Sequence, residues 1–344
     1  MRLGFLLLLA AFLFVDAGAQ VLQREVPTSR RLETLQSVGG LPADLAATFR
    51  EPLQFQQAVS GQYFVFDQRG HTVFGGDADT TRLWKIVQIG HEEGRIIEPT
   101  AFDMEPNGNF VVADAPAGRD RIQLFAPNGS PIGGFTLPNR SKARITFGGV
   151  ALSGIGSLQY TGRSVLINQP ETGALITEYG LSGTPVRTIG RLRKTGYESD
   201  RELHLAFNAG LPLVDPRGGF YFVFQAGVPL LQKYDAKGTL VFERHIEGRE
   251  LDELVASQPT TWPRRKTEEG ELALVMPTVR TAAVDRSSNL WISFVVPYTY
   301  VYNPDGDKVR TVQFRAAGII SPSSLFFSHT GRLLVTPGCY EFKP

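Results

Sequence analysis

A short unit, in which a tight turn is followed by an apolar strand, recurs six times along this chain of 344 residues. Each turn is followed by residues such as Tyr, Phe, Val, Leu and Ile, which pack well on a pleated surface. The residues at the six turns are Gly61, Gly108, Gly162, Gly218, Ser288 and Gly331. Their intervals of roughly 40 to 70 residues indicate a repeat built from a few β-strands.

The second repeat, residues 99–137, has the clearest pattern. The turns Asn107-Gly108 and Asn128-Gly129 supply the positive φ that tight hairpins require. They separate extended apolar pieces, which are Thr100–Met104, Asn109–Ala113, Arg121–Phe125 and Pro131–Phe135. This repeat therefore predicts a four-stranded antiparallel meander of roughly 40 residues, the size of one propeller blade.

Six such units predict an all-β fold, a six-bladed β-propeller of four-stranded antiparallel blades over residues 51–344. The last repeat holds only about three strands before the chain ends at Pro344, fewer than a blade requires. An open ring would leave two exposed sheet edges, which invite aggregation. We therefore expect an N-terminal strand from the segment 20–50, within Glu25–Leu35, to complete the last blade and close the ring.

The first 19 residues have the pattern of a signal peptide. Arg2 gives a positive start, Phe5–Val15 is apolar, and Ala17-Gly18-Ala19 matches a small-residue cleavage site. The alternative is an uncleaved membrane anchor, although the apolar run is short for a bilayer span. The sequence predicts a secreted or periplasmic protein with no membrane span after signal cleavage.

Two charge-rich insertions, residues 190–205 and 247–275, interrupt the repeats and show no strand pattern. Within the second, Arg249–Ala256 is expected to form a short helix. Both leave a blade's outer strand for the next inner strand, so both should decorate the same face of the propeller. Long loops of this kind are often functional, and the alternative is that they are solvated connections.

Composition excludes some function classes. The net charge of +1 argues against a nucleic-acid footprint, which needs a clustered basic face. The one cysteine, Cys339, allows no intrachain disulfide and is expected to be a buried free thiol. No metal-ligand set, catalytic triad or cofactor motif is legible, so the sequence predicts no metal, no cofactor and no chemistry.

Charged and polar residues in the loops that enter the inner strands form the candidate ligand site at the channel mouth. Because an Arg guanidinium recognises carboxylate and phosphate groups, this mixture suits a small polar or anionic ligand. The alternative is a set of salt bridges between blades. The candidates are Arg50, Glu51, Glu98, Arg144, Asn208 and Arg280.

A second candidate surface lies in the longer insertion. Trp262 precedes Arg264 and Arg265, and an exposed Trp with basic neighbours is a plausible tip for binding a protein partner. The alternative is that Trp262 packs the insertion onto the propeller.

The second repeat resembles an NHL repeat over VVADAPAGRDRIQLFAPNGSPIGGF. Asp114 closes its second strand, Arg121-Ile122 opens the third, and Asn128-Gly129 forms the turn. Asp114 and Arg121 are expected to pair across the loop and fix it. The whole chain is similar to secreted bacterial six-bladed propeller proteins.

The resemblance implies a six-bladed propeller, a fold that hosts binding scaffolds, lactonases and lyases. Lactonases of related fold hold a divalent cation with Glu, Asn and Asp side chains, a role that would fall here to Glu51, Glu98 and Asn208. Neighbouring arginines oppose cation binding. We therefore expect a non-catalytic extracytoplasmic binding protein, with a divalent-metal-dependent lactonase or hydrolase as the alternative.

Overall fold

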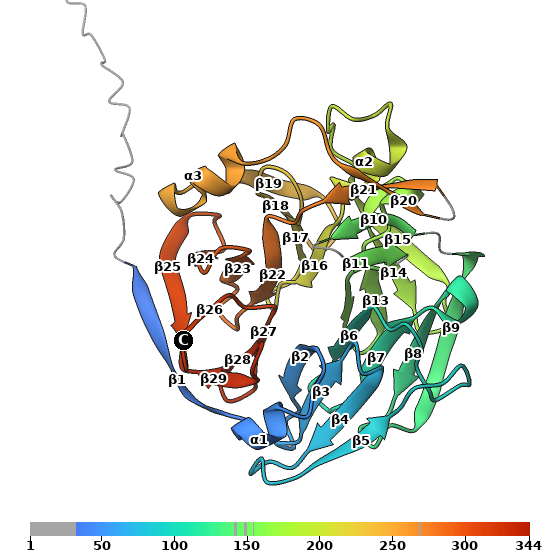
Figure 1. Ribbon diagram of the computed structural model, residues 1–344, viewed down its shortest axis with the longest axis vertical. Coiled ribbons are helices and arrows are strands. Elements are labelled where there is room, and N and C mark those ends of the chain that lie inside the picture. Colours follow the sequence, from blue (N-terminus) through green and yellow to red (C-terminus); the bar gives the residue numbers. More distant parts are fainter. Residues whose placement is uncertain (1–31, 141–142, 148–149, 154, 268–269) are drawn as a thin grey trace, which may run out of the picture. The chain divides into compact units, whose positions relative to one another are not determined.

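The computed structural model describes residues 32–140, 143–147, 150–153, 155–267 and 270–344, which form a β-propeller of four-stranded antiparallel blades (Figure 1). In four of its sheets, consecutive strands pair in chain order. These sheets are β2 (Pro52–Gln57), β3 (Tyr63–Asp67), β4 (Thr72–Gly76) and β5 (Leu83–Val87); β6 (Ala101–Met104), β7 (Phe110–Asp114), β8 (Arg119–Phe125) and β9 (Pro131–Arg140); β12 (Leu158–Tyr160), β13 (Ser164–Ile167), β14 (Ala174–Gly180) and β15 (Pro185–Arg191); and β16 (Gly210–Val214), β17 (Phe220–Phe224), β18 (Leu230–Tyr234) and β19 (Leu240–His245).

A nine-stranded sheet contains the remaining repeats. It joins β22 (Val279–Val284), β23 (Leu290–Phe294), β24 (Thr299–Tyr302), β25 (Lys308–Arg315), β26 (Ile319–Ile320), β27 (Ser324–Phe327), β28 (Leu333–Thr336) and β29 (Tyr340–Phe342) through β1 (Glu33–Gly40). The first half of β1 runs parallel to β25, and its second half pairs antiparallel with β29.

β1 overlaps the expected segment Glu25–Leu35 only at its start and extends to Gly40. The pairing with β29 uses Ser37, Gly39 and Gly40, beyond the predicted range, while residues up to 31 lie outside the described part of the chain. Gly40 has φ +132°, and a Cβ there would lie 2.3 Å from the carbonyl oxygen of Cys339. The close approach of β1 to the last repeat therefore requires glycine at this position.

All six predicted turn residues adopt positive φ, between 64° at Ser288 and 102° at Gly218. This confirms the alignment of the repeats, since the same backbone conformation recurs at each aligned position. The strands expected in the second repeat are confirmed to within a few residues at their ends, the largest difference being the longer β9. Cys339 is also confirmed as a buried free thiol.

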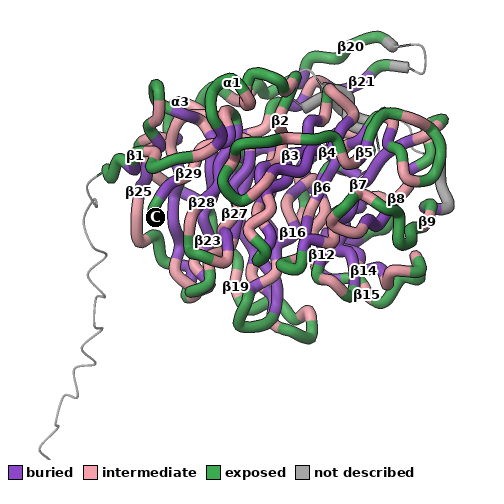
Figure 2. Tube along the Cα trace, turned by 90° about the horizontal axis from the view of Figure 1, so that it is seen from below, coloured by how far each residue is buried: buried purple, intermediate pink, exposed green. Residues whose placement is uncertain are grey.

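Apolar residues fill the space between neighbouring blades. The middle strands β3, β7 and β17 are buried along their whole length, because each is covered on both faces (Figure 2). Phe66 of β3 stacks on Phe102 of β6 with ring centroids 5.6 Å apart, which joins the first two repeats. The outer strand β19 is mostly exposed.

The first strands of the repeats contact one another in series. β2 contacts β6, β6 contacts β12, β12 contacts β16, β16 contacts β22, β22 contacts β27, and β27 contacts β2. The first strands of the six repeats therefore surround one central space.

An additional sheet forms from the segments between repeats, in the order β11 (Val150–Ser153), β10 (Ala143–Phe147), β21 (Gly270–Val275) and β20 (Arg264–Thr267). The expectation that the insertion 247–275 lacks strands is wrong. The reason is that β20 is an edge strand whose residues Arg264–Lys266 are all exposed, so it shows no apolar alternation. The predicted helix over Arg249–Ala256 is confirmed as α3.

The other insertion contributes α2 (Arg201–Ala206), which contacts both β10 and β21. Asp200 caps this helix, because its side chain accepts a hydrogen bond from the backbone N–H of Leu203. The two insertions therefore pack together on the additional sheet.

Candidate functional site

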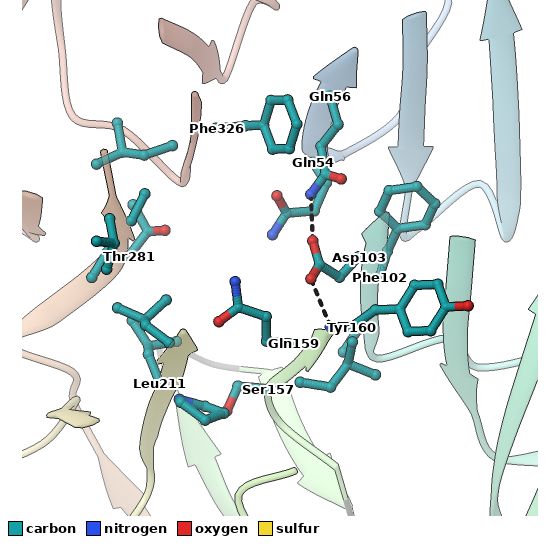
Figure 3. A pocket seen from close by; sticks show the side chains of 18 of the residues that line it. Gln54, Gln56, Phe102, Asp103, Ser157, Gln159, Tyr160, Leu211, Thr281 and Phe326 are labelled. Atoms are coloured by element: carbon teal, nitrogen blue, oxygen red, sulfur yellow. Dashed lines mark hydrogen bonds between the residues drawn. The ribbon is translucent and has the colours of Figure 1, made fainter. Parts of the chain in front are cut away.

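A cavity of about 490 Å³ lies between the first strands of the repeats. Its wall includes residues from β2, β6, β12, β16, β22 and β27 (Figure 3). The residue five positions before each predicted turn contributes to this wall in all six repeats. These residues are Gln56, Asp103, Ser157, Leu213, Ala283 and Phe326.

Alternation along β2 explains how an apolar blade presents polar groups to the cavity. Phe55 is fully buried in the blade core, whereas Gln54 and Gln56 on either side of it line the cavity. In β6, Asp103 lies on the cavity wall together with its neighbours Phe102 and Met104.

Asp103 is the only acidic residue among the described residues that line the cavity. Its Oδ1 accepts a hydrogen bond from Nε2 of Gln56 at 3.1 Å, and its Oδ2 accepts one from the backbone N–H of Tyr160 at 2.8 Å (Figure 3). Burial raises the pKa of Asp103 to about 6, against the opposing effect of the hydrogen bonds from Tyr160 and Gln56. The carboxyl group can therefore change its charge near neutral pH.

Gln56 is 3% exposed, and its Oε1 has no hydrogen-bond partner within the described part of the chain. A buried acceptor without a donor destabilises a folded protein by about 1–3 kcal/mol. This oxygen lies on the same amide that donates to Asp103, so the missing donor would come from the vicinity of the carboxylate.

Two more glutamine amides and an apolar wall complete the cavity. Oε1 of Gln159 accepts a hydrogen bond from the backbone N–H of Val214. Gln54 and Gln159 extend into the central space in Figure 3, with Leu211 and Phe326 also on its wall. The cavity thus combines hydrogen-bonding groups on one part of its wall with apolar surface on another.

The structure does not gather the six predicted ligand-site residues. Arg280 lines the cavity. Arg50 and Glu51 are exposed, and their backbone N–H groups donate to Asp67 at 3.0 and 2.7 Å. Glu98 is exposed in a loop with φ 50°.

Asn208 is not among the described residues that line the cavity. Asn208 is fully buried; its Oδ1 accepts from the backbone N–H of Arg193 and its Nδ2 donates to the carbonyl of His204, both at 2.9 Å. Arg144 lies in β10, and its side chain is outside the described part of the molecule. Asn208 therefore orders the loop that leads into β16.

Trp262 is buried and packs the longer insertion onto the rest of the molecule, which was the alternative to an exposed tip that binds a partner. It is 5% exposed, and its ring meets Phe207 edge-on with centroids 5.4 Å apart. The expectation of an exposed tip is wrong because the additional sheet covers the indole. Arg264 pairs with Asp200 and Glu202 beside it, and Arg265 is exposed.

The expected pairing of Asp114 with Arg121 is confirmed. Nε and Nη2 of Arg121 donate to the two carboxylate oxygens at 2.9 and 2.6 Å. Oδ2 of Asp114 also accepts from the backbone N–H of Ile97 at 3.1 Å, which ties the loop before β6 to the end of β7. This pair has a structural role.

Within the described residues, no group of three or more His, Cys, Asp or Glu side chains is placed to hold a metal ion. In the same part of the chain, no helix has the length and apolar character to cross a membrane.

Sequence reasoning missed the residues that form the polar wall, namely Gln54, Gln56, Asp103 and Gln159. The available signal was the presence of polar residues within the first strands, and two of them, Gln56 and Asp103, lie five positions before the turn of their repeat. The prediction considered the loops that enter the first strands and did not consider the strands themselves.

Comparison with known proteins supports the fold. No protein-family model and no curated protein sequence matches this chain. A solved structure titled as streptogramin B lyase has a TM-score of 0.50 and 10% identity, over 85% of this chain and 92% of that one. A virginiamycin B lyase from Staphylococcus aureus has a TM-score of 0.49 and 11% sequence identity, over 83% of this chain and 77% of that one. The WD40 β-propeller domain of Doa1 has a TM-score of 0.47 and 8% sequence identity, over 90% of this chain and 95% of that one.

At these identities, the likeness to the first of these structures supports the fold alone. This chain is therefore similar to β-propeller proteins in architecture.

Proposed function

We propose that this protein is a non-catalytic β-propeller that binds a small polar ligand in the cavity between its first strands. The observation that carries the proposal is the buried Oε1 of Gln56, an acceptor without a protein partner on the wall of that cavity. A ligand that donates a hydrogen bond would remove the cost of leaving it unpaired. The volume of about 490 Å³ is within the range of small-molecule sites.

The proposal includes a ring of six blades closed by β1. The nine-stranded sheet then represents two blades, β22–β25 and β27–β29, with β1 as the outer strand of the second. Six aligned turns and the series of contacts from β2 through β27 and back to β2 support this count. The NHL-like pattern around Asp114 and Arg121 fits such a repeat.

We also propose that residues 1–19 are a signal peptide and that the mature protein is secreted or periplasmic. The positive start, the short apolar run and the small residues before position 20 support this. The insertions packed on the additional sheet would then offer a second surface for a protein partner, with Arg265 exposed on it.

A fragment screen by saturation-transfer NMR tests the binding function. Gln54→Trp would narrow the cavity and keep the backbone pairing of β2 with β3, in which position 54 lies opposite Phe66. Gln88→Trp, at an exposed glutamine after β5, is the matched control. We expect fragments that bind the wild type and Gln88→Trp but not Gln54→Trp. Fragments that bind all three proteins equally would contradict the proposal.

The lactonase alternative is tested on the same protein by metal analysis. A stoichiometric, tightly held divalent cation together with lactone hydrolysis would replace the binding function by the enzymatic one.

A further inference from the structure

Given the proposed binding function, we propose that the cavity recognises the cationic head of a small organic molecule, an ammonium or guanidinium group, through Asp103 and Gln56. The ligand class follows from what the cavity wall leaves unpaired.

The first step concerns the charge of Asp103. Its carboxylate accepts hydrogen bonds from the side-chain amide of Gln56 and from the backbone N–H of Tyr160, and the backbone of Met104 adds a third such interaction. All of these donors are neutral. An ionised carboxylate has about four acceptor sites. Asp103 therefore retains acceptor capacity, and no cationic side chain among the described residues forms an ion pair with it. A largely buried charge is stable only when it is paired.

The second step concerns the surroundings of that carboxylate. On the neighbouring first strands, the cavity residues closest in the fold are Gln54 and Gln56 from β2 and Gln159 and Tyr160 from β12. Within its own blade, Asp103 pairs with Val111 of β7.

Besides Asp103, the charged residues on the described cavity wall are Arg280 and Arg286, both exposed and both from the region of β22. Neither contributes to the shift in the pKa of Asp103, which comes from burial and hydrogen bonds. A cation from the ligand would therefore be the partner that Asp103 lacks.

The third step concerns the second acceptor. Oε1 of Gln56 is buried and unpartnered, on the amide whose Nε2 already donates to Asp103. An ammonium group has three donors and a guanidinium group has five. Either can donate to the carboxylate and to a nearby amide oxygen together, whereas an anion would meet two acceptors and no donor there.

The fourth step separates an organic cation from a metal ion. Leu211 and Phe326 give the cavity an apolar wall, which would cover a hydrocarbon or aromatic body attached to the cationic head. A metal ion would leave that surface unused, and the described residues offer no cluster of three metal-ligating side chains.

The test uses three probes of nearly the same shape: benzylammonium, benzyl alcohol and benzoate, with calcium chloride as a fourth. Binding to the full-length protein is measured by calorimetry at pH 7.5. We expect benzylammonium to bind at least about tenfold more tightly than benzyl alcohol, because a hydrogen bond to a charged group is roughly twice as strong as a neutral one.

Asp103→Asn should bring the affinity for benzylammonium to within about twofold of that for benzyl alcohol. The matched control is Asp305→Asn, which removes one negative charge at an exposed hairpin turn where Asn-Gly is also favoured. This control should bind the probes as the wild type does.

A second measurement does not depend on a variant. Because the carboxyl of Asp103 takes up a proton as pH falls through about 6, wild-type affinity for benzylammonium should fall about tenfold between pH 7.5 and pH 5.0. Affinity for benzyl alcohol should stay constant.

The outcomes separate this inference from the function on which it rests. Benzyl alcohol, benzoate or calcium binding as tightly as benzylammonium, with loss in Gln54→Trp, would overturn the cation preference and leave the cavity as a binding site. If no probe binds and the fragment screen also finds no occupant, both proposals are wrong.

Discussion

Replacing Asp103 by asparagine should stabilise the protein in a pH-dependent manner. Burial raises the pKa of Asp103 from its ordinary value of 3.8 to about 6, so the folded state holds the proton more tightly than the unfolded chain. Between about pH 4 and pH 6, the ionisation of this group therefore lowers the free energy of unfolding as pH rises.

The magnitude follows from the two pKa values. Each pKa unit corresponds to about 1.36 kcal/mol, so the full effect is roughly 3 kcal/mol once the pH is well above 6. An asparagine side chain has no charge to bury. Its carbonyl can accept from the backbone N–H of Tyr160, and its amide can donate to Oε1 of Gln56 after that side chain turns over.

Urea unfolding of the wild type and Asp103→Asn at pH 4, 5, 6, 7 and 8 measures this difference. We expect the free energies of unfolding to be nearly equal at pH 4 and the variant to be more stable by up to about 3 kcal/mol at pH 8. The other carboxyl groups titrate in both proteins, so their contributions to the free energy of unfolding cancel in the difference. A pH-independent difference, or a variant less stable at pH 8, would refute the reasoning.

Contacts elsewhere predict single-site losses of stability, measured by the same unfolding assay. Arg121→Ala should lower the free energy of unfolding by about 3 kcal/mol, because it leaves the buried Asp114 without its cation. A loss below about 1 kcal/mol would mean that this ion pair does not stabilise the loop. Trp262→Ala should cost about 3–5 kcal/mol through the cavity it creates, whereas unchanged stability would contradict its packing role. Gly40→Ala should lower the free energy of unfolding by more than about 2 kcal/mol, because its Cβ would clash with the carbonyl oxygen of Cys339. The control Gly318→Ala, at a position with open space around it, should change the free energy of unfolding little. Equal losses in the two variants would contradict the close approach of β1 to the last repeat.

The repeat architecture could be predicted because its turns depend on local backbone chemistry. A position that requires positive φ favours glycine, and five of the six turns have it. Ser288 fills the sixth with φ 64°, where its hydroxyl donates to Asp215 and accepts from Nε of Arg217. Hydrogen bonds of the serine hydroxyl with Asp215 and Arg217 of the preceding repeat therefore accompany the same turn conformation without glycine.

The additional sheet could not be predicted, because its central pairing joins distant parts of the chain. β10 runs parallel to β21, with Ile145 opposite Ala273. Such a pairing leaves no turn in the sequence to mark it, and the charged edge strand β20 has the composition of a solvated loop.

The candidate site was missed for a geometric reason. The loops entering the first strands carry charged residues, but Arg50, Glu51 and Glu98 among them are exposed. The cavity is built instead by strand residues such as Gln56 and Asp103, and the direction of Gln56 depends on the two-residue alternation around Phe55. Both side chains stand five positions before a turn, so their common place in the repeat is visible in the aligned sequence.

A crystal structure of the protein soaked with benzylammonium at pH 7.5 tests the central claim most directly. The account predicts the ammonium nitrogen within hydrogen-bond distance of Asp103 and Gln56, with the ring against Leu211 and Phe326. An empty cavity at saturating probe, or a probe that lies only outside the first strands, would contradict it.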